Sequence, residues 1–167
     1  MAKVRDYVPD YAVMAHRGST FWAPEETESA WRWAREMGAD YLESDLQCTK
    51  DGVILANHDD NLKRTTNIEN VYSEMVPATR KAFYMRHGMS EAEAEKLVAA
   101  DKASFRPYYA MSYMYEELLA LDAGSWFNET SIEQARESFS EQHQYISALE
   151  DQIRYAEGKM LARDADG

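Results

Sequence analysis

Three short apolar runs, each associated with a polar cluster, limit what this chain can fold into. Residues 11–15, 41–47 and 53–57 have the length and composition of β-strands. The first run leads into His-Arg-Gly at residues 16–18, and the last leads into His-Asp at residues 58–59. We therefore expect polar side chains to gather at the ends of a few strands.

The middle run carries two carboxylates of its own. Because side chains alternate along a strand, Glu43 and Asp45 should point to the same face, close enough to grip one cation. Residues 49–52 (Thr-Lys-Asp-Gly) predict a tight turn into the next run. A turn centred there would set Asp45 opposite Asn57 and bring His58 close to both carboxylates.

Together these clusters supply two imidazoles, two oxygen ligands for hard metals and one guanidinium, from His16, His58, Glu43, Asp45 and Arg17. A lone histidine is usually a surface or core residue, and a Glu-x-Asp pair in a strand is usually part of a solvated face. So many of these groups on few strands favour a site instead. The inventory suits metal-assisted phosphodiester chemistry.

Further motifs follow in a fixed order over residues 11–127. After His-Arg-Gly come Ala-Pro-Glu-Glu-Thr at 23–27, Gly-Ala-Asp-Tyr-Leu-Glu-Ser-Asp at 38–45, Thr-Lys-Asp-Gly-Val at 49–53, His-Asp at 58–59, Arg-Thr-Thr-Asn at 64–67 and Leu-Asp-Ala-Gly-Ser-Trp-Phe at 121–127. In this order they resemble the glycerophosphodiester phosphodiesterases. Glu26 departs from the family pattern, which usually has Asn there, and the stretch between Asn67 and Leu121 is longer than usual.

The resemblance implies an α/β fold of the TIM-barrel type and hydrolysis of a small-molecule glycerophosphodiester to an alcohol and glycerol 3-phosphate. It implies that His16 and His58 are the catalytic acid/base pair, that Arg17 binds the substrate phosphate, and that Glu43 and Asp45 bind a divalent metal. Imidazole titrates near neutrality, which suits proton transfer. Carboxylate ligands without a cysteine favour Mg²⁺ or Ca²⁺ over zinc.

The length of the chain bears on the barrel fold that the resemblance implies. A barrel of this type typically needs roughly 250 residues, whereas this chain has 167. The family also places a third metal carboxylate on a later strand, and no such strand is visible after residue 127. We therefore expect residues 1–167 to be the amino-terminal portion of a phosphodiesterase barrel, aggregation-prone and poorly active alone, although a smaller self-contained variant is an alternative.

Other segments predict helices. Residues 27–37 have helical spacing with Gly38 as a cap, and capping boxes at 90–93 and 147–150 each open a helix. The second of these helices carries an apolar stripe of Leu149, Ile153, Ala156 and Met160, and we expect its surface near Ile153 and Met160 to be uncovered in this chain. Residues 72–115 resemble an inserted segment on the barrel rim, either a lid or an accessory packing module.

Glu25 lies close to Arg17 in sequence. It is expected to pair with Arg17 and orient the guanidinium without binding the metal. The alternative is a carboxylate at the start of a helix, favoured by the local dipole.

Composition narrows the class of protein. Eighteen basic against thirty acidic residues give a net charge of −12, which argues against a nucleic-acid partner. No run reaches membrane-spanning length. Cys48 is the only cysteine, which allows a cytosolic protein and equally a mature periplasmic or secreted one.

The same residues allow other functions. A related phosphodiesterase acting on phosphoinositides or sphingolipids would use a similar histidine pair. A non-catalytic module that binds phosphorylated ligands would tolerate loss of a histidine, and a structural protein would scatter these residues in space.

Overall fold

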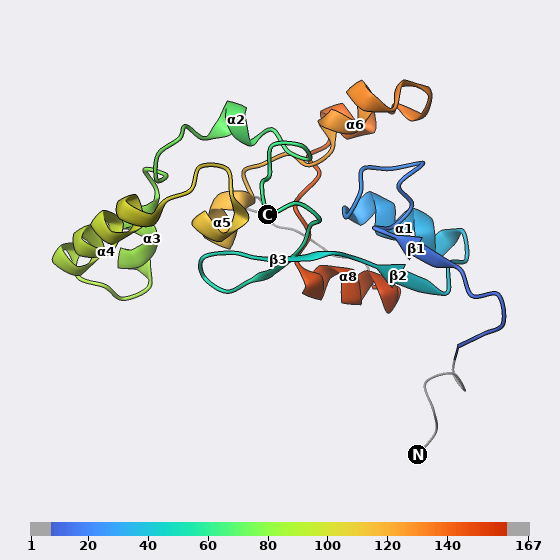
Figure 1. Ribbon diagram of the computed structural model, residues 1–167, viewed down its shortest axis with the longest axis horizontal. Coiled ribbons are helices and arrows are strands. Elements are labelled where there is room, and N and C mark those ends of the chain that lie inside the picture. Colours follow the sequence, from blue (N-terminus) through green and yellow to red (C-terminus); the bar gives the residue numbers. More distant parts are fainter. Residues whose placement is uncertain (1–7, 160–167) are drawn as a thin grey trace, which may run out of the picture.

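The computed structural model describes residues 8–159, which form a mixed α/β chain with two small sheets. In the first sheet, β1 (Met14–His16) runs parallel to β2 (Tyr41–Glu43), with His16 opposite Glu43. Helix α1 (Glu28–Glu36) connects the two strands (Figure 1). A parallel pair needs such a crossover, because a tight turn can join only antiparallel strands.

The second sheet is an antiparallel hairpin of β3 (Leu46–Cys48) and β4 (Ile54–Ala56). Its register is the one predicted, since the backbone N–H of Asn57 donates to the Asp45 carbonyl at 3.0 Å. The turn is closed by a hydrogen bond of 2.6 Å from the Thr49 hydroxyl to Asp51.

The prediction that residues 41–47 form one strand is wrong. The run divides between β2 and β3 at residues 44–45, where its partner changes from β1 to β4. At this break the Asp45 backbone N–H donates to the Glu26 carboxylate at 2.7 Å. A side chain from a distant loop therefore takes a hydrogen bond that a continuous strand would give to a neighbouring strand.

Helix α1 matches its prediction closely. The Thr27 side chain caps its amino terminus, and Gly38, with φ of +85°, follows its carboxyl terminus. Trp31 is fully buried, as expected for a packing residue.

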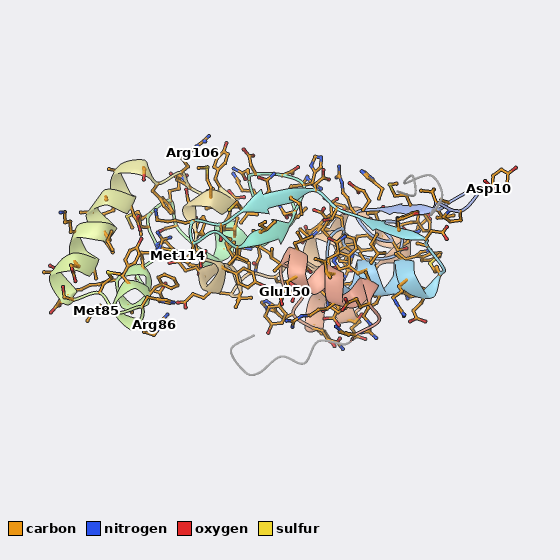
Figure 2. All side chains as sticks on the ribbon, turned by 90° about the horizontal axis from the view of Figure 1, so that it is seen from below. Asp10, Met85, Arg86, Arg106, Met114 and Glu150 are labelled. Atoms are coloured by element: carbon orange, nitrogen blue, oxygen red, sulfur yellow. The ribbon has the colours of Figure 1, made fainter. Side chains whose placement is uncertain are left out.

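The middle of the chain is helical. Its elements are α2 (Ile68–Val71), α3 (Arg80–Arg86), α4 (Glu91–Ser104), the 3₁₀ turn η2 (Ala110–Ser112) and α5 (Tyr115–Leu118). The capping box that predicted α4 is present, because Ser90 and Glu93 exchange hydrogen bonds. Helices α3 and α4 pack together at the end of the molecule away from β1 (Figure 1). In the second view Met85 and Arg86 lie at that end and Asp10 at the other (Figure 2).

The last part of the described chain contains α6 (Ser125–Thr130), the 3₁₀ turn η3 (Ile132–Gln134), α7 (Ser138–Glu141) and α8 (Leu149–Ala156). Helix α8 packs on α1 and β4. None of the helices within residues 8–159 is long and apolar enough to cross a membrane.

Helix α8 leaves Ile153 uncovered, as expected, and buries other residues. Gln152 and Tyr155 face inward, while Ile153 is 51% exposed, and Met160 lies outside the described residues. Gln152 accepts a hydrogen bond of 2.9 Å from the Ser44 hydroxyl and donates one of 3.4 Å to the Leu42 carbonyl. These polar contacts with the β2–β3 segment set the rotation of the helix, and apolar periodicity does not report them.

The largest hydrophobic cluster lies between the hairpin and the segments that follow it. Its buried members are Leu55, Leu62, Ile68, Ala110, Tyr113, Leu118, Leu121, Ala123 and Ile146. This core holds the loop after β4 in place, and that loop carries His58.

Candidate active site

Arg17 follows the last residue of β1 in a left-handed backbone conformation, with φ of +57°. Its backbone N–H donates to both the carbonyl (3.0 Å) and the carboxylate (3.1 Å) of Glu43. Gly18 has a φ of +85°, and a Cβ there would lie 2.7 Å from that of Ala30 on α1. Glycine is therefore required at this turn, both for its conformation and for the close approach of the helix.

The Arg17 side chain lies between two carboxylates. Its Nη1 is 3.4 Å from Glu25 Oε1, and its Nε is 3.0 Å from Asp45 Oδ2. The contact with Asp45 is not aligned as a hydrogen bond, so both buried atoms keep unused bonding capacity. Unpaired buried polar atoms are uncommon in folded proteins, and a bound ion or ligand is one explanation for them.

Glu25 also binds a second arginine. Both of its carboxylate oxygens accept hydrogen bonds from Arg64, at 2.7 and 3.1 Å. The Nε of Arg64 donates to Asp59 at 2.5 Å. Asp59 in turn lies 2.5 Å from Nδ1 of His58.

These contacts form a continuous series of opposite charges, which we call the charged array: Asp45, Arg17, Glu25, Arg64, Asp59 and His58. The hydrogen bond from Arg64 lowers the pKa of Asp59 to about 2, with further support from His58 and opposed by partial burial. Asp59 therefore stays ionised at neutral pH and accepts a hydrogen bond from Nδ1–H of His58, which leaves Nε2 of that ring free to exchange protons.

His16 ends β1 and is exposed. The parallel register sets it opposite Glu43, whose carboxylate contacts Arg17. A cavity of about 460 Å³ borders His16 and has an apolar side that includes Phe21 and Met37. The predicted residues Arg17, Glu25, Asp45 and Glu43 are thus brought into contact, His58 is linked to them through Asp59 and Arg64, and His16 adjoins them by register.

Glu26 is a further carboxylate at this site, noted in the sequence only as a departure from the family pattern. It is 3% exposed, with a φ of +55°. Its backbone N–H donates to the Arg17 carbonyl at 3.0 Å, and its Oε1 binds the Asp45 N–H. Burial raises its pKa to about 7, and this effect is partly offset by the hydrogen bond from Asp45.

The donor set can be compared with what a divalent cation needs. Glu43 and Asp45 offer carboxylate oxygens next to Arg17, and the buried Oε2 of Glu26 has no hydrogen-bond partner. Hard oxygens of this kind suit Mg²⁺ or Ca²⁺. Within residues 8–159, however, no three such ligands are already arranged around one point, so water or other oxygens would complete the coordination.

Two members of the charged array, Asp59 and Arg64, were not assigned roles from the sequence, although both lie in motifs that the family resemblance uses. The sequence did contain a signal for these two roles. An arginine six residues after a candidate catalytic histidine, and an acidic residue next to that histidine, are the groups that could orient its ring.

The sequence matches a known protein family and several of its members. The model of the Glycerophosphoryl diester phosphodiesterase family matches residues 16–162. A glycerophosphodiester phosphodiesterase of Bacillus subtilis (strain 168) is 31% identical over 126 residues, which cover 75% of this chain and 30% of that protein. A glycerophosphoinositol inositolphosphodiesterase of Mus musculus is 30% identical over 127 residues, covering 76% of this chain and 18% of that one.

Solved structures resemble the chain as well. The glycerophosphodiester phosphodiesterase of Agrobacterium tumefaciens str. C58 is 25% identical, with a TM-score of 0.51, covering 88% of this chain and 43% of that one. An Oleispira antarctica phosphodiesterase, solved with sn-glycerol-3-phosphate, is 24% identical, with a TM-score of 0.57, covering 92% and 42%. The chain therefore spans less than half the length of each of these relatives.

Proposed function

The chain belongs to the glycerophosphoryl diester phosphodiesterase family, and we propose that its charged array serves the hydrolysis of glycerophosphodiesters to an alcohol and glycerol 3-phosphate. The fold we propose for these residues is the first part of a TIM-type barrel. The parallel β1–α1–β2 unit supports this, because His16 and Glu43 are the last residues of parallel strands. Active sites of such barrels lie at the carboxyl ends of their strands.

The observation that carries this proposal is the continuous contact from His58 to Arg17. The guanidinium of Arg17 has Glu25 on one side and a poorly aligned contact with Asp45 on the other. A substrate phosphate can replace the contact with Asp45 and accept paired hydrogen bonds, while Glu25 keeps the guanidinium oriented.

His58 is well arranged for proton transfer. Its Nδ1 is bound to Asp59, and 42% of its side chain is exposed. We assign His58 and His16 as the acid/base pair, with one ring accepting a proton from the attacking hydroxyl and the other donating one to the departing alkoxide. Glu43 and Asp45 would hold Mg²⁺ or Ca²⁺, which would neutralise charge on the phosphate.

The inositolphosphodiesterase among the relatives supports a second candidate within the same reaction class. Glycerophosphoinositol would then be cut on the other side of phosphorus, releasing inositol phosphate. The site residues would keep their roles, and only the leaving group would change.

The test is product analysis on the 167-residue chain. Glycerophosphocholine and glycerophosphoinositol are incubated with the protein and Mg²⁺ or Ca²⁺, or with a chelator, and products are followed by ³¹P NMR. We expect glycerol 3-phosphate in low yield, since these residues are proposed to form only the first part of the barrel, and we expect it to form only with a cation and to be lost in His58→Ala.

Binding gives a readout that does not need turnover. Titration with sn-glycerol 3-phosphate in the presence of Ca²⁺ should shift the Arg17 side-chain Nε–H resonance in a ¹H–¹⁵N spectrum. Arg154, whose exposed side chain pairs with Glu150 on α8, serves as the control resonance. Absence of both hydrolysis and an Arg17-specific shift would refute the proposed function.

A further inference from the structure

We propose that Arg64 is a positioning residue that holds His58 and Arg17 in one arrangement, by binding the carboxylate partner of each. The inference rests on the proposed function, because it assigns Arg64 to the site in which His58 and Arg17 would act. Arg64 itself reaches neither of them directly. It acts through Asp59 on one side and Glu25 on the other.

The geometry of the guanidinium carries the inference. One part of it, Nε, binds Asp59 at 2.5 Å, while Nη1 and Nη2 bind the two oxygens of Glu25 at 3.1 and 2.7 Å. All three bonds use the fixed planar fork of arginine. A lysine at this position offers one ammonium, which cannot hold two carboxylates in these directions.

An exposed ion pair alone would carry little weight, since such pairs are weak in water. Here the arginine is 43% exposed, but the Glu25 side chain is only 12% exposed and that of Asp59 27%. Each carboxylate also binds a residue assigned to the reaction. Without Arg64, Glu25 and Asp59 would each lose a charged partner while remaining mostly covered from solvent.

The loop that presents Arg64 is held firmly. The neighbouring Thr65 and Thr66 are buried, and the Thr66 hydroxyl donates to the carbonyl of the fully buried Leu62 at 2.6 Å. Asn57 fixes the other end of the loop by donating to the Asp59 carbonyl at 2.5 Å. The backbone therefore keeps its place when the side chain at 64 is changed, so a substitution tests the contacts and not the loop.

Two consequences follow from removing these contacts. Without Arg64, the Asp59 side chain loses the contact that fixes its orientation, so the acceptor for Nδ1–H of His58 is no longer held in one place and the ring samples both tautomers. Without Arg64, Glu25 turns fully to Arg17, and that guanidinium gives up freedom to meet the phosphate. Both effects lower turnover while leaving the reacting groups in the chain.

The experiment compares Arg64→Ala and Arg64→Lys with the control Arg86→Lys, in which an exposed arginine paired with Glu116 is changed in α3, away from β1. Long-range ¹H–¹⁵N spectra report the tautomer of His58, assigned with His58→Gln. We expect the Nδ1–H tautomer in the unchanged protein and in Arg86→Lys, and a mixture in both Arg64 variants. Hydrolysis of glycerophosphocholine should fall roughly 10- to 100-fold in both.

The outcomes separate the two proposals. If the unchanged chain shows neither hydrolysis nor the Arg17 Nε–H shift, the proposed function fails, while the His58 tautomer still decides the role of Arg64. If both Arg64 variants are folded by circular dichroism and keep the His58 tautomer and the Arg17 Nε–H shift, the inference is overturned. If Arg64→Ala does not fold, Arg64→Lys, which keeps the charge, decides alone.

Discussion

Two ionic networks in this chain use the same residue types in opposite ways. The charged array ends in unaligned atoms, since Nε of Arg17 and Oδ2 of Asp45 lie 3.0 Å apart without forming a hydrogen bond. The second network is centred on Arg80, which is fully buried. Its guanidinium donates to Glu117 at 2.9 and 2.7 Å, to Asp101 at 2.6 Å and to the Ser112 carbonyl at 2.8 Å.

The two networks differ in how far their polar atoms are already paired. Each nitrogen of Arg80 has a hydrogen-bond partner, and the four bonds engage four of its five N–H groups, so the network chiefly holds helices together. The charged array is partly exposed and incompletely matched, at a place where the backbone of Arg17 is also in an uncommon conformation. Uncommon conformations and unused polar atoms of this kind collect at functional sites.

The Arg80 network also explains how the segment at 72–115 is attached. Asp101 of α4 binds Lys50 of the hairpin turn at 2.9 Å and the Tyr84 hydroxyl of α3 at 2.7 Å. The segment is thus tied to the sheet by buried charges, which favours the packing interpretation over a mobile lid. Its position on a barrel rim remains a prediction.

The largest expected effect is loss of His58 from the charged array. His58→Ala should lower kcat for glycerophosphocholine about 10²- to 10⁴-fold, because the group that we propose to transfer a proton is removed. His87→Ala is the matched control, since His87 lies at the end of α3 in the other region and stacks on Phe83. Near-normal kcat in His58→Ala would show that His58 has no catalytic role and that the charged array does not differ from the Arg80 network in this way.

Removal of Arg80 should affect stability instead. Arg80→Met takes the charged partner from buried Glu117 and one of several partners from Asp101, and should lower the free energy of unfolding by about 3–5 kcal/mol. Urea unfolding at low temperature measures this, and binding of sn-glycerol 3-phosphate should stay unchanged under conditions where the variant is folded. A loss of binding in the folded variant would show that the two networks are coupled.

Glu26, which binds Asp45 of the charged array, should make the stability of the protein depend on pH. Its pKa is raised from 4.5 to about 7, so the folded protein keeps a proton that the unfolded chain releases. Stability should therefore fall as pH rises through this window, and the full cost of the buried charge is present above pH 7. Glu26→Gln, measured by urea unfolding with a chelator, should be more stable than the unchanged protein by about 2–3 kcal/mol at pH 8 and nearly equal to it at pH 4.5. Parallel pH profiles for the two proteins would show that Glu26 titrates normally.

The sequence predicted those parts of the molecule that depend on local patterns. The turn at 49–52 set the hairpin register, and Thr27 and Gly38 marked the ends of α1. Sequence patterns did not report the places where side chains from distant segments decide the outcome. Glu26 divides the run at 41–47, and Gln152 rotates α8, through hydrogen bonds that span 19 to 110 positions of the chain.

The same distinction applies to the site. The sequence indicated that residues next to strand ends lie close together, because their positions follow from the strands. The link from Arg64 to Glu25 joins residues 39 positions apart, and the Arg80 network joins α3 to residues 21 to 37 positions away. Charge pairing over such separations has no periodic signature, so a sequence pattern alone could not tell which arginine serves a site and which serves packing.

The smallest expected effect is replacement of the carboxylate shared by Arg17 and Arg64. Glu25→Gln keeps the shape of the side chain and one acceptor oxygen, but it weakens two charge-assisted contacts at once. We expect turnover to fall about tenfold and the free energy of unfolding to change by less than about 1 kcal/mol, since the Arg64 pair is partly exposed. Glu117→Gln is the matched change in the Arg80 network and should show the reverse, a clear loss of stability with unchanged phosphate binding. If Glu25→Gln changed only stability, Glu25 would be a carboxylate favoured by the dipole of α1, and the charged array would be architectural like its counterpart.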